Sequence, residues 1–145
     1  MVKNVIFLWV FIFTHNVYAS EWSIGVRCFT NNDKKTINLK LVDMHSKRNN
    51  INIGYIKYEK SSKAIPIVFV KNDEVLSKTR PPISLTIWNE IFNGKVNGTY
   101  TIISQGEWYS GLIYKNKKGE ETSFIENIDS FIETKTEEKG DCIWK

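Results

Sequence analysis

Residues 22–41 read WSIGVRCFTNNDKKTINLKL, and the alternation within them predicts the fold of the whole chain. Apolar side chains occupy every second position over residues 22–28 and again over residues 37–41. A polar segment rich in Asn, Asp and Lys separates the two runs. Because a period of two is typical of a half-buried strand, the stretch predicts two antiparallel strands joined by a turn.

Similar patterns fill most of the remaining chain. Residues 51–58 alternate, residues 65–70 form an apolar run, and residues 83–125 read as a four-stranded meander that contains the hairpin dipeptide Asn93-Gly94. Residues 71–82 lack a period and are predicted to form an exposed loop, whereas residues 127–139 predict either a short helix or an extended arm. Eight or nine short strands favour a single antiparallel β-sandwich or barrel-like domain.

The N-terminal residues have the features of a secretory signal. Lys3 precedes an apolar run over residues 5–13, and small residues stand at Val17 and Ala19. This order predicts a signal peptide over residues 1–19, with cleavage between Ala19 and Ser20. Because the apolar run is too short to span a bilayer, residues 20–145 are predicted to form one periplasmic or secreted domain without a membrane span.

Two cysteines, Cys28 and Cys142, lie near the two ends of the predicted mature chain. In an oxidising compartment such a pair indicates a disulfide. The bond would join the first strand to the C-terminal tail and stabilise the fold by up to about 4–5 kcal/mol through loop entropy. Trp22 and Trp144 flank the two cysteines, and we expect both to pack over the bond.

Charge is distributed unevenly along the chain, whose net charge is +4. Residues 27–80 carry 12 basic and 5 acidic side chains, a net of +7, whereas residues 107–141 carry 5 basic and 9 acidic, a net of −4. The pattern indicates either solvated loops of both signs or a dipolar surface that steers a charged partner. A basic face with an acidic counterpart is not typical of nucleic-acid binding, so no nucleic-acid partner is predicted.

Signatures of catalysis are absent from the sequence. His45 is the single histidine after the signal, and no nucleophile motif, metal-ligand cluster or phosphate-binding loop is present. The sequence therefore predicts a protein that is not an enzyme, with no catalytic residues, no metal and no cofactor. The alternative is a small glycan hydrolase that uses two of the carboxylates of Glu90, Glu107, Glu120 and Glu121.

Aromatic side chains are the remaining candidates for a binding surface. Trp88 falls out of phase with the apolar positions before it, so it is predicted to point outward as a binding residue. The alternative is that Trp88 and Trp108 cover the core of a second sheet. Trp108 and Tyr109 follow a Gln-Gly turn, and Arg80 belongs to the predicted loop over residues 71–82. Exposed Trp, Tyr and Arg side chains are typical of binding hot spots.

These features together predict a small exported protein that binds and neutralises another protein, such as a toxin or hydrolase. An immunity protein or a hydrolase inhibitor would be of this type. The alternative is a secreted virulence or adhesion factor that uses the same aromatic side chains to bind a host glycan or receptor.

Overall fold

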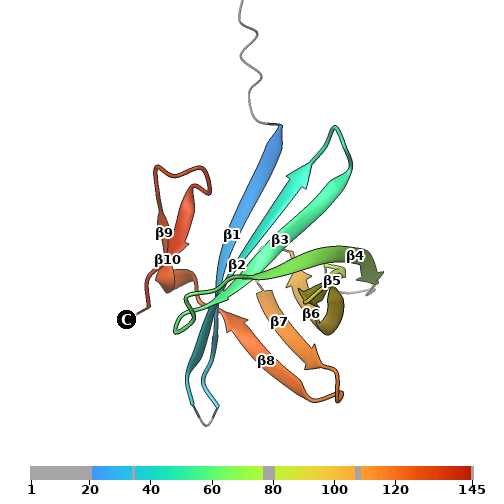
Figure 1. Cartoon of the computed structure of the whole chain (residues 1–145), viewed down its shortest axis with the longest axis vertical. Coiled ribbons are helices and arrows are strands. Elements are labelled where there is room, and N and C mark those ends of the chain that lie inside the picture. The colour runs from blue at the N-terminus through green and yellow to red at the C-terminus, as the bar shows by residue number, and fades with distance from the viewer. Residues whose placement is uncertain (1–20, 34, 77–80, 107–108, 145) are drawn as a thin grey trace, which may run out of the picture.

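Eight antiparallel strands close into a barrel in the computed structural model of this protein (Figure 1). The structure describes residues 21–33, 35–76, 81–106 and 109–144. Each strand pairs with the next in chain order: β1 (Trp22–Asn31), β2 (Ile37–Ser46), β3 (Ile51–Tyr58), β4 (Ile65–Val75), β5 (Ile83–Phe92), β6 (Lys95–Gln105), β7 (Tyr109–Asn116) and β8 (Glu121–Glu126). The predicted all-β domain is confirmed, and of the two predicted architectures it is the barrel.

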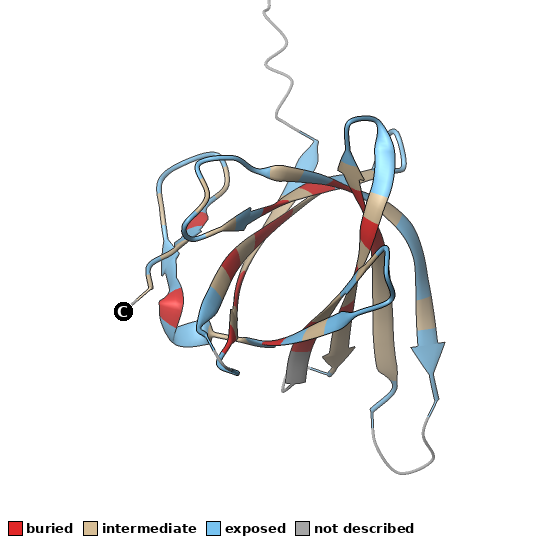
Figure 2. Ribbon diagram, turned by 60° about the horizontal axis from the view of Figure 1, so that its bottom comes forward, coloured by how far each residue is buried: buried red, intermediate tan, exposed pale blue. Residues whose placement is uncertain are grey.

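Alternation along the strands separates the inner wall of the barrel from the outer wall. Leu39 and Leu41 are fully buried, whereas Lys40 between them lies on the outer face. Figure 2 shows the buried segments of the strands that surround the interior. The core consists of Phe29, Leu39, Leu41, Ile56, Ile67, Trp88, Tyr100, Ile102, Leu112 and Phe124. Apolar and aromatic side chains from all eight strands thus pack inside the barrel, as the width of an eight-stranded barrel allows.

Strand β4 is longer than the sequence predicts. Its register against β5 shifts between Phe69 and Lys71, so Val70 is the extra residue of a β-bulge, and pairing continues to Val75. The predicted loop over residues 71–82 is therefore wrong for residues 71–75. The bulge inverts the alternation, and polar Asn72 then accepts hydrogen bonds from two side chains of β5. Residues 77–80 of the predicted loop lie outside the described residues.

After β8 the chain forms one turn of 3-10 helix, η1 (Ile128–Ser130), and then a two-stranded sheet of β9 (Phe131–Glu133) and β10 (Gly140–Cys142). Asn127 caps the turn by accepting a hydrogen bond from the Ser130 amide. Of the two alternatives for residues 127–139, the extended arm is correct beyond this turn. Lys139, at φ +57°, lies in the turn between the two strands.

The disulfide between Cys28 and Cys142 is formed, with the Cα atoms 5.8 Å apart. It joins β1 to β10 and fastens the C-terminal segment to the outer wall of the barrel. Trp22 lies six residues before Cys28, roughly 20 Å along an extended strand, and is 38% exposed. The expectation that Trp22 packs over the disulfide is therefore wrong, because the strand carries it to the far end of the barrel.

Candidate functional site

The C-terminal segment is held on the barrel by charged contacts as well as by the disulfide. The Lys40 ammonium, on β2, lies 3.1 Å from Glu138 Oε2 and 3.1 Å from Asp141 Oδ1. Tyr55, on β3, donates its hydroxyl hydrogen bond to Glu138, and its ring centroid lies 5.8 Å from the Lys40 nitrogen. Lys40 thus contacts two carboxylates and an aromatic face at once.

These contacts shift the protonation equilibria of the groups involved. Burial by itself lowers the pKa of Lys40, but the hydrogen bonds to Glu138 and Asp141 outweigh it, so the pKa lies above its ordinary value. Burial raises the pKa of Asp141, but the Cys142 amide and Lys40 outweigh this effect and hold it below its ordinary value. Lys40 and Asp141 are therefore each stabilised in their charged form.

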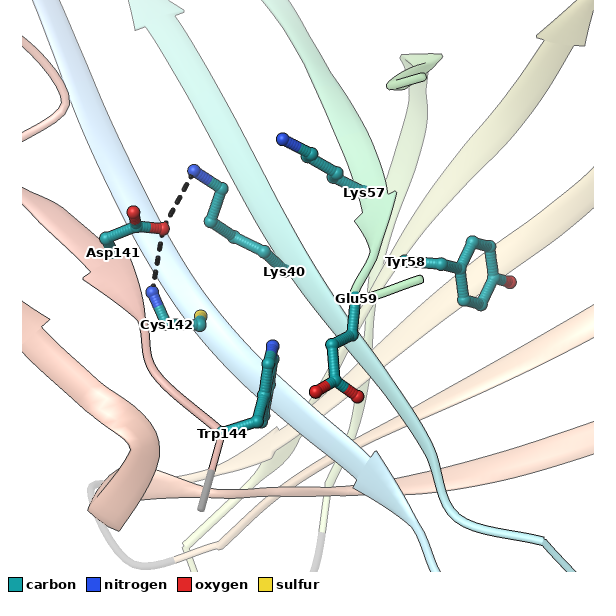
Figure 3. Close-up of a pocket in the computed structure, with 7 residues that line it drawn as sticks. All are labelled: Lys40, Lys57, Tyr58, Glu59, Asp141, Cys142 and Trp144. Carbon is teal, nitrogen blue, oxygen red and sulfur yellow. Dashed lines mark hydrogen bonds and ion pairs between the residues drawn. The ribbon is translucent and has the colours of Figure 1, made fainter. Parts of the chain in front are cut away.

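A depression of about 220 Å³ opens beside this contact (Figure 3). Its lining side chains come from β2, from the end of β3 and from the C-terminal tail: Lys40, Lys57, Tyr58, Glu59, Asp141, Cys142 and Trp144. In Figure 3 the ammonium groups of Lys40 and Lys57 lie on one side, and the Trp144 ring stands near the Glu59 carboxylate. The Tyr58 ring points away from them.

The two lysines of the depression are cross-strand partners in the ladder between β2 and β3. Directly opposed like charges destabilise a sheet unless something neutralises them. Lys40 has Glu138 and Asp141 as partners, whereas Lys57 is exposed and forms no ion pair with the other described residues. A lysine ammonium and an aromatic ring that line the same depression are suited to a ligand with both an anionic group and an apolar surface.

The interior of the barrel holds a second polar cluster, centred on Glu90. The carboxylate of Glu90 is buried and accepts a hydrogen bond from Asn97, at 2.6 Å. Burial and the nearby carboxylate raise the pKa of Tyr114 to about 12. The hydroxyls of Tyr58 and Tyr100 pair at 3.1 Å. These contacts satisfy the polar groups at one end of a packed core.

Trp88 belongs to this interior and not to a binding surface. It is 4% exposed, and its ring packs edge-on against Phe69 with the centroids 5.7 Å apart. The prediction that Trp88 points outward is wrong, because the inner face of β5 carries Trp88 and Glu90 while Ile87 takes the outer face. The buried indole nitrogen has no hydrogen-bond partner among the described residues.

The other predicted binding residues are not placed. Arg80 and Trp108 lie outside the described residues, and Tyr109 begins β7 with its side chain likewise outside what the structure describes. Their roles stay predictions. The sequence did not predict that Lys57, Glu59 and Trp144 line one depression. The outward parity of Lys57 was readable in the sequence, but its position opposite Lys40 depends on the β2–β3 register.

Of the four carboxylates considered for hydrolysis, the three that the structure describes do not meet on one face. Glu90 lies inside the barrel, whereas Glu121 forms an ion pair with Lys115 at 2.9 Å on the outer wall. Glu120 accepts a hydrogen bond from Asn116 in the turn between β7 and β8, and Glu107 is outside the described residues. Among the residues that the structure describes, no group of three or more His, Cys, Asp or Glu side chains could hold a metal ion.

The oppositely charged halves of the sequence meet in the fold. Arg27 forms a two-point ion pair with Glu126, at 2.9 and 3.0 Å, across 99 positions of sequence, and Lys40 reaches Glu138 across 98. Part of the predicted charge asymmetry therefore serves internal contacts.

Comparison with protein-family models, with curated proteins and with solved structures finds no match to this chain. Within the described ranges, no helix has the length and apolar character that a membrane crossing requires.

Proposed function

We propose that this protein is an exported binding protein that holds and neutralises another protein, in the manner of an immunity protein or a hydrolase inhibitor. The single observation that supports it best is the exposed Lys57 ammonium, opposite Lys40 and in the same depression as Trp144. We infer that a carboxylate of the partner binds to Lys57 while an apolar part of the same side chain or its neighbour contacts Trp144. The proposal includes export, with which the disulfide is consistent.

The packed barrel interior favours binding on the outer surface. Phe29, Leu41 and Tyr100 are fully buried within it. The depression, in contrast, is open and lies where the disulfide fixes the tail against the barrel. A rigid surface lowers the ordering cost of association. The ammonium of Lys57, which forms no ion pair with the other described residues, raises the rate of encounter with an acidic partner.

A glycan ligand is the second candidate, because the depression combines an aromatic ring with charged hydrogen-bonding groups. Trp144 offers an apolar face, and Glu59 and Lys57 offer an acceptor and a donor on the same surface. Stacking of a sugar on an aromatic face with polar groups at its edge uses this set of side chains.

The test starts with capture of a partner from the native source by the purified mature protein. The captured protein is then purified, and its affinity is measured by titration calorimetry. Lys57→Glu and Trp144→Ala should each weaken binding by at least about tenfold, since central charged and aromatic contacts carry most of an interface's energy. Binding should also weaken as salt concentration rises.

The matched control is Lys118→Glu, which makes the same change of charge in the turn between β7 and β8. It should leave the affinity within about twofold, because only long-range electrostatics change. Equal losses for Lys57→Glu and Lys118→Glu would refute the proposed contact. Glycan-array binding that depends on Trp144, without a stoichiometric protein partner, would replace the protein-binding proposal with the second candidate.

A further inference from the structure

The pairing of β1 with β8, which closes the barrel, is shorter than strand β1 itself. We call this pairing the seam. Strand β1 pairs with β8 only at Phe29 and Thr30, and the Asn127 amide adds one hydrogen bond of 2.7 Å to the Cys28 carbonyl. Residues 22–27 pair with β2 alone in the part of the chain that the structure describes. Figure 1 shows this part of β1 extending, with β2 and β3, beyond the ends of β7 and β8.

The backbone groups of this unpaired edge follow from the alternation of an antiparallel ladder. A residue directs its N–H and its C=O to the same side, and successive residues alternate between sides. Because the Cys28 carbonyl faces the seam, the polar groups of Trp22, Ile24 and Val26 face it too. These three residues therefore present backbone donors and acceptors that no other described residue pairs with, at the spacing that another strand would meet.

A depression of about 210 Å³ adjoins the end of this edge. Its lining residues are Val26, Arg27, Cys28, Glu126, Asn127, Ile128 and Phe131. The ion pair between Arg27 and Glu126 uses both charges internally, whereas Ile128 is 76% exposed and Phe131 is 39% exposed. An aliphatic side chain suits this place better than a charged one, because no unpaired charge of the lining remains to receive it.

We propose that the edge of β1 at residues 22–26 binds an extended segment of a partner protein as an added strand. The segment's backbone pairs with Trp22, Ile24 and Val26, and one aliphatic side chain enters the depression beside Ile128. Strand addition of this kind derives affinity from main-chain hydrogen bonds and specificity from alternate side chains. This proposal rests on the proposed function, because it specifies that the partner protein presents an extended segment to β1.

Only a polypeptide offers donors and acceptors at the required spacing, which is why the occupant is a peptide and not a small molecule. The edge lies on the other side of the disulfide from the depression of Lys57. Cys142 lines the depression of Lys57, and Cys28 lines the depression beside the edge of β1. A protein bound to the C-terminal segment can therefore reach both.

The test uses the purified mature protein and a synthetic probe, so it does not depend on finding the partner. The probe is an eight-residue peptide that alternates valine and threonine, with a lysine at each end for solubility. The control peptide has the same sequence, with two adjacent central residues N-methylated so that neither edge can pair. Binding and amide exchange are followed by NMR.

In the free protein, the amides of Ile24 and Val26 should exchange at least about tenfold faster than that of Gly25, whose N–H faces β2. The probe should protect Ile24 and Val26, and the methylated peptide should not. Equal protection in the free protein, equal binding of the two peptides, or a peptide-free dimer that buries this edge would each overturn the proposal.

Proline substitution provides a second test. Ile24→Pro removes an amide that faces the seam, so the native spectrum should persist and the Tm should fall by no more than about 4 °C, while peptide binding is lost. Ile24→Thr keeps the amide and should keep binding. Ser23→Pro removes an amide that faces β2 and should lower the Tm further. Retained peptide binding by the Ile24→Pro variant would refute strand addition. If the proposed contact at Lys57 were refuted, the peptide-binding and exchange results expected here would not change, so the two proposals can fail separately.

Discussion

Replacement of Lys40 by methionine tests how the C-terminal segment is held on the barrel. Methionine keeps the length and apolar stem of the side chain and removes the charge. In the native protein the Lys40 ammonium lies 3.1 Å from one oxygen each of Glu138 and Asp141. The variant leaves both carboxylates close together without their shared cation.

The size of the effect follows from the burial of the lysine. The Lys40 side chain is only 14% exposed, whereas that of Lys115, in the ion pair with Glu121, is 55% exposed. Hydrogen bonds to charged groups contribute about 1.5–3 kcal/mol, and exposed ion pairs about 0–1 kcal/mol. Because Glu138 and Asp141 remain accessible to water, we expect Lys40→Met to lower the free energy of unfolding by about 2 kcal/mol. Lys115→Met should lower it by less than about 0.5 kcal/mol.

The contribution of Lys40 has a defined pH window. The folded-state pKa of Lys40 is raised, so its stabilisation is complete below the ordinary value of 10.5 and is lost as pH rises through the raised pKa. The folded-state pKa of Asp141 is lowered, so its share is complete above 3.8 and is lost as pH falls through the lowered pKa. The difference in the free energy of unfolding between wild type and Lys40→Met should therefore be constant between pH 3.8 and pH 10.5 and should shrink outside this range.

Urea unfolding of wild type, Lys40→Met and Lys115→Met, monitored by tryptophan fluorescence, measures the three free energies. A cycle with Glu138→Gln isolates the coupling between Lys40 and Glu138. Equal losses for the two lysine variants, or zero coupling in the cycle, would show that the contact with Glu138 and Asp141 does not hold the segment.

Three further outcomes follow from the structure. Gly54→Ala should lower the free energy of unfolding by about 3 kcal/mol, because the added methyl group meets a backbone carbonyl. In Gly25→Ala the methyl group meets only a flexible carboxylate, so the loss should be about 1 kcal/mol, and urea denaturation of both variants measures the difference. Replacing both cysteines with serine should cost about 4 kcal/mol in the loop-entropy model, and a loss below 1 kcal/mol in urea unfolding would contradict it. Glu90→Gln should move the pKa of Tyr114 down from about 12, and an unchanged alkaline titration of the variant would show that burial alone sets it.

The period of two was enough to predict the fold class, because each strand buries one face only. Leu39 and Leu41 turn inward for the same reason that Lys40 turns outward. Alternation does not specify how a sheet closes, so sandwich and barrel stayed open. It also failed where a β-bulge inverted the phase at Val70, since the extra residue moves the following side chains to the opposite face.

The candidate site was less accessible to sequence reasoning. The error at Trp88 came from the assumption that the apolar residues before it face inward, whereas this barrel has an outer wall with many apolar side chains, among them Val68 and Val70. Lys57 and Trp144 are 87 positions apart in the sequence. The disulfide that brings the C-terminal segment to the barrel was predicted from the two cysteines. The path of that segment across β2 and β3 leaves no local pattern, so the shared depression was not predicted.

The same disulfide that closes the chain also defines both proposed contact sites. Cys142 lines the depression that contains Lys57, and Cys28 lines the depression at the unpaired edge of β1. The barrel strands pair with one another without help from the C-terminal segment, since β9 and β10 form a separate sheet. Without the bond, the segment would keep only side-chain contacts such as those of Lys40, and both depressions would lose one wall whenever it detached. The stability added by the disulfide is therefore directed to the segment that shapes the proposed binding surface more than to the barrel that supports it.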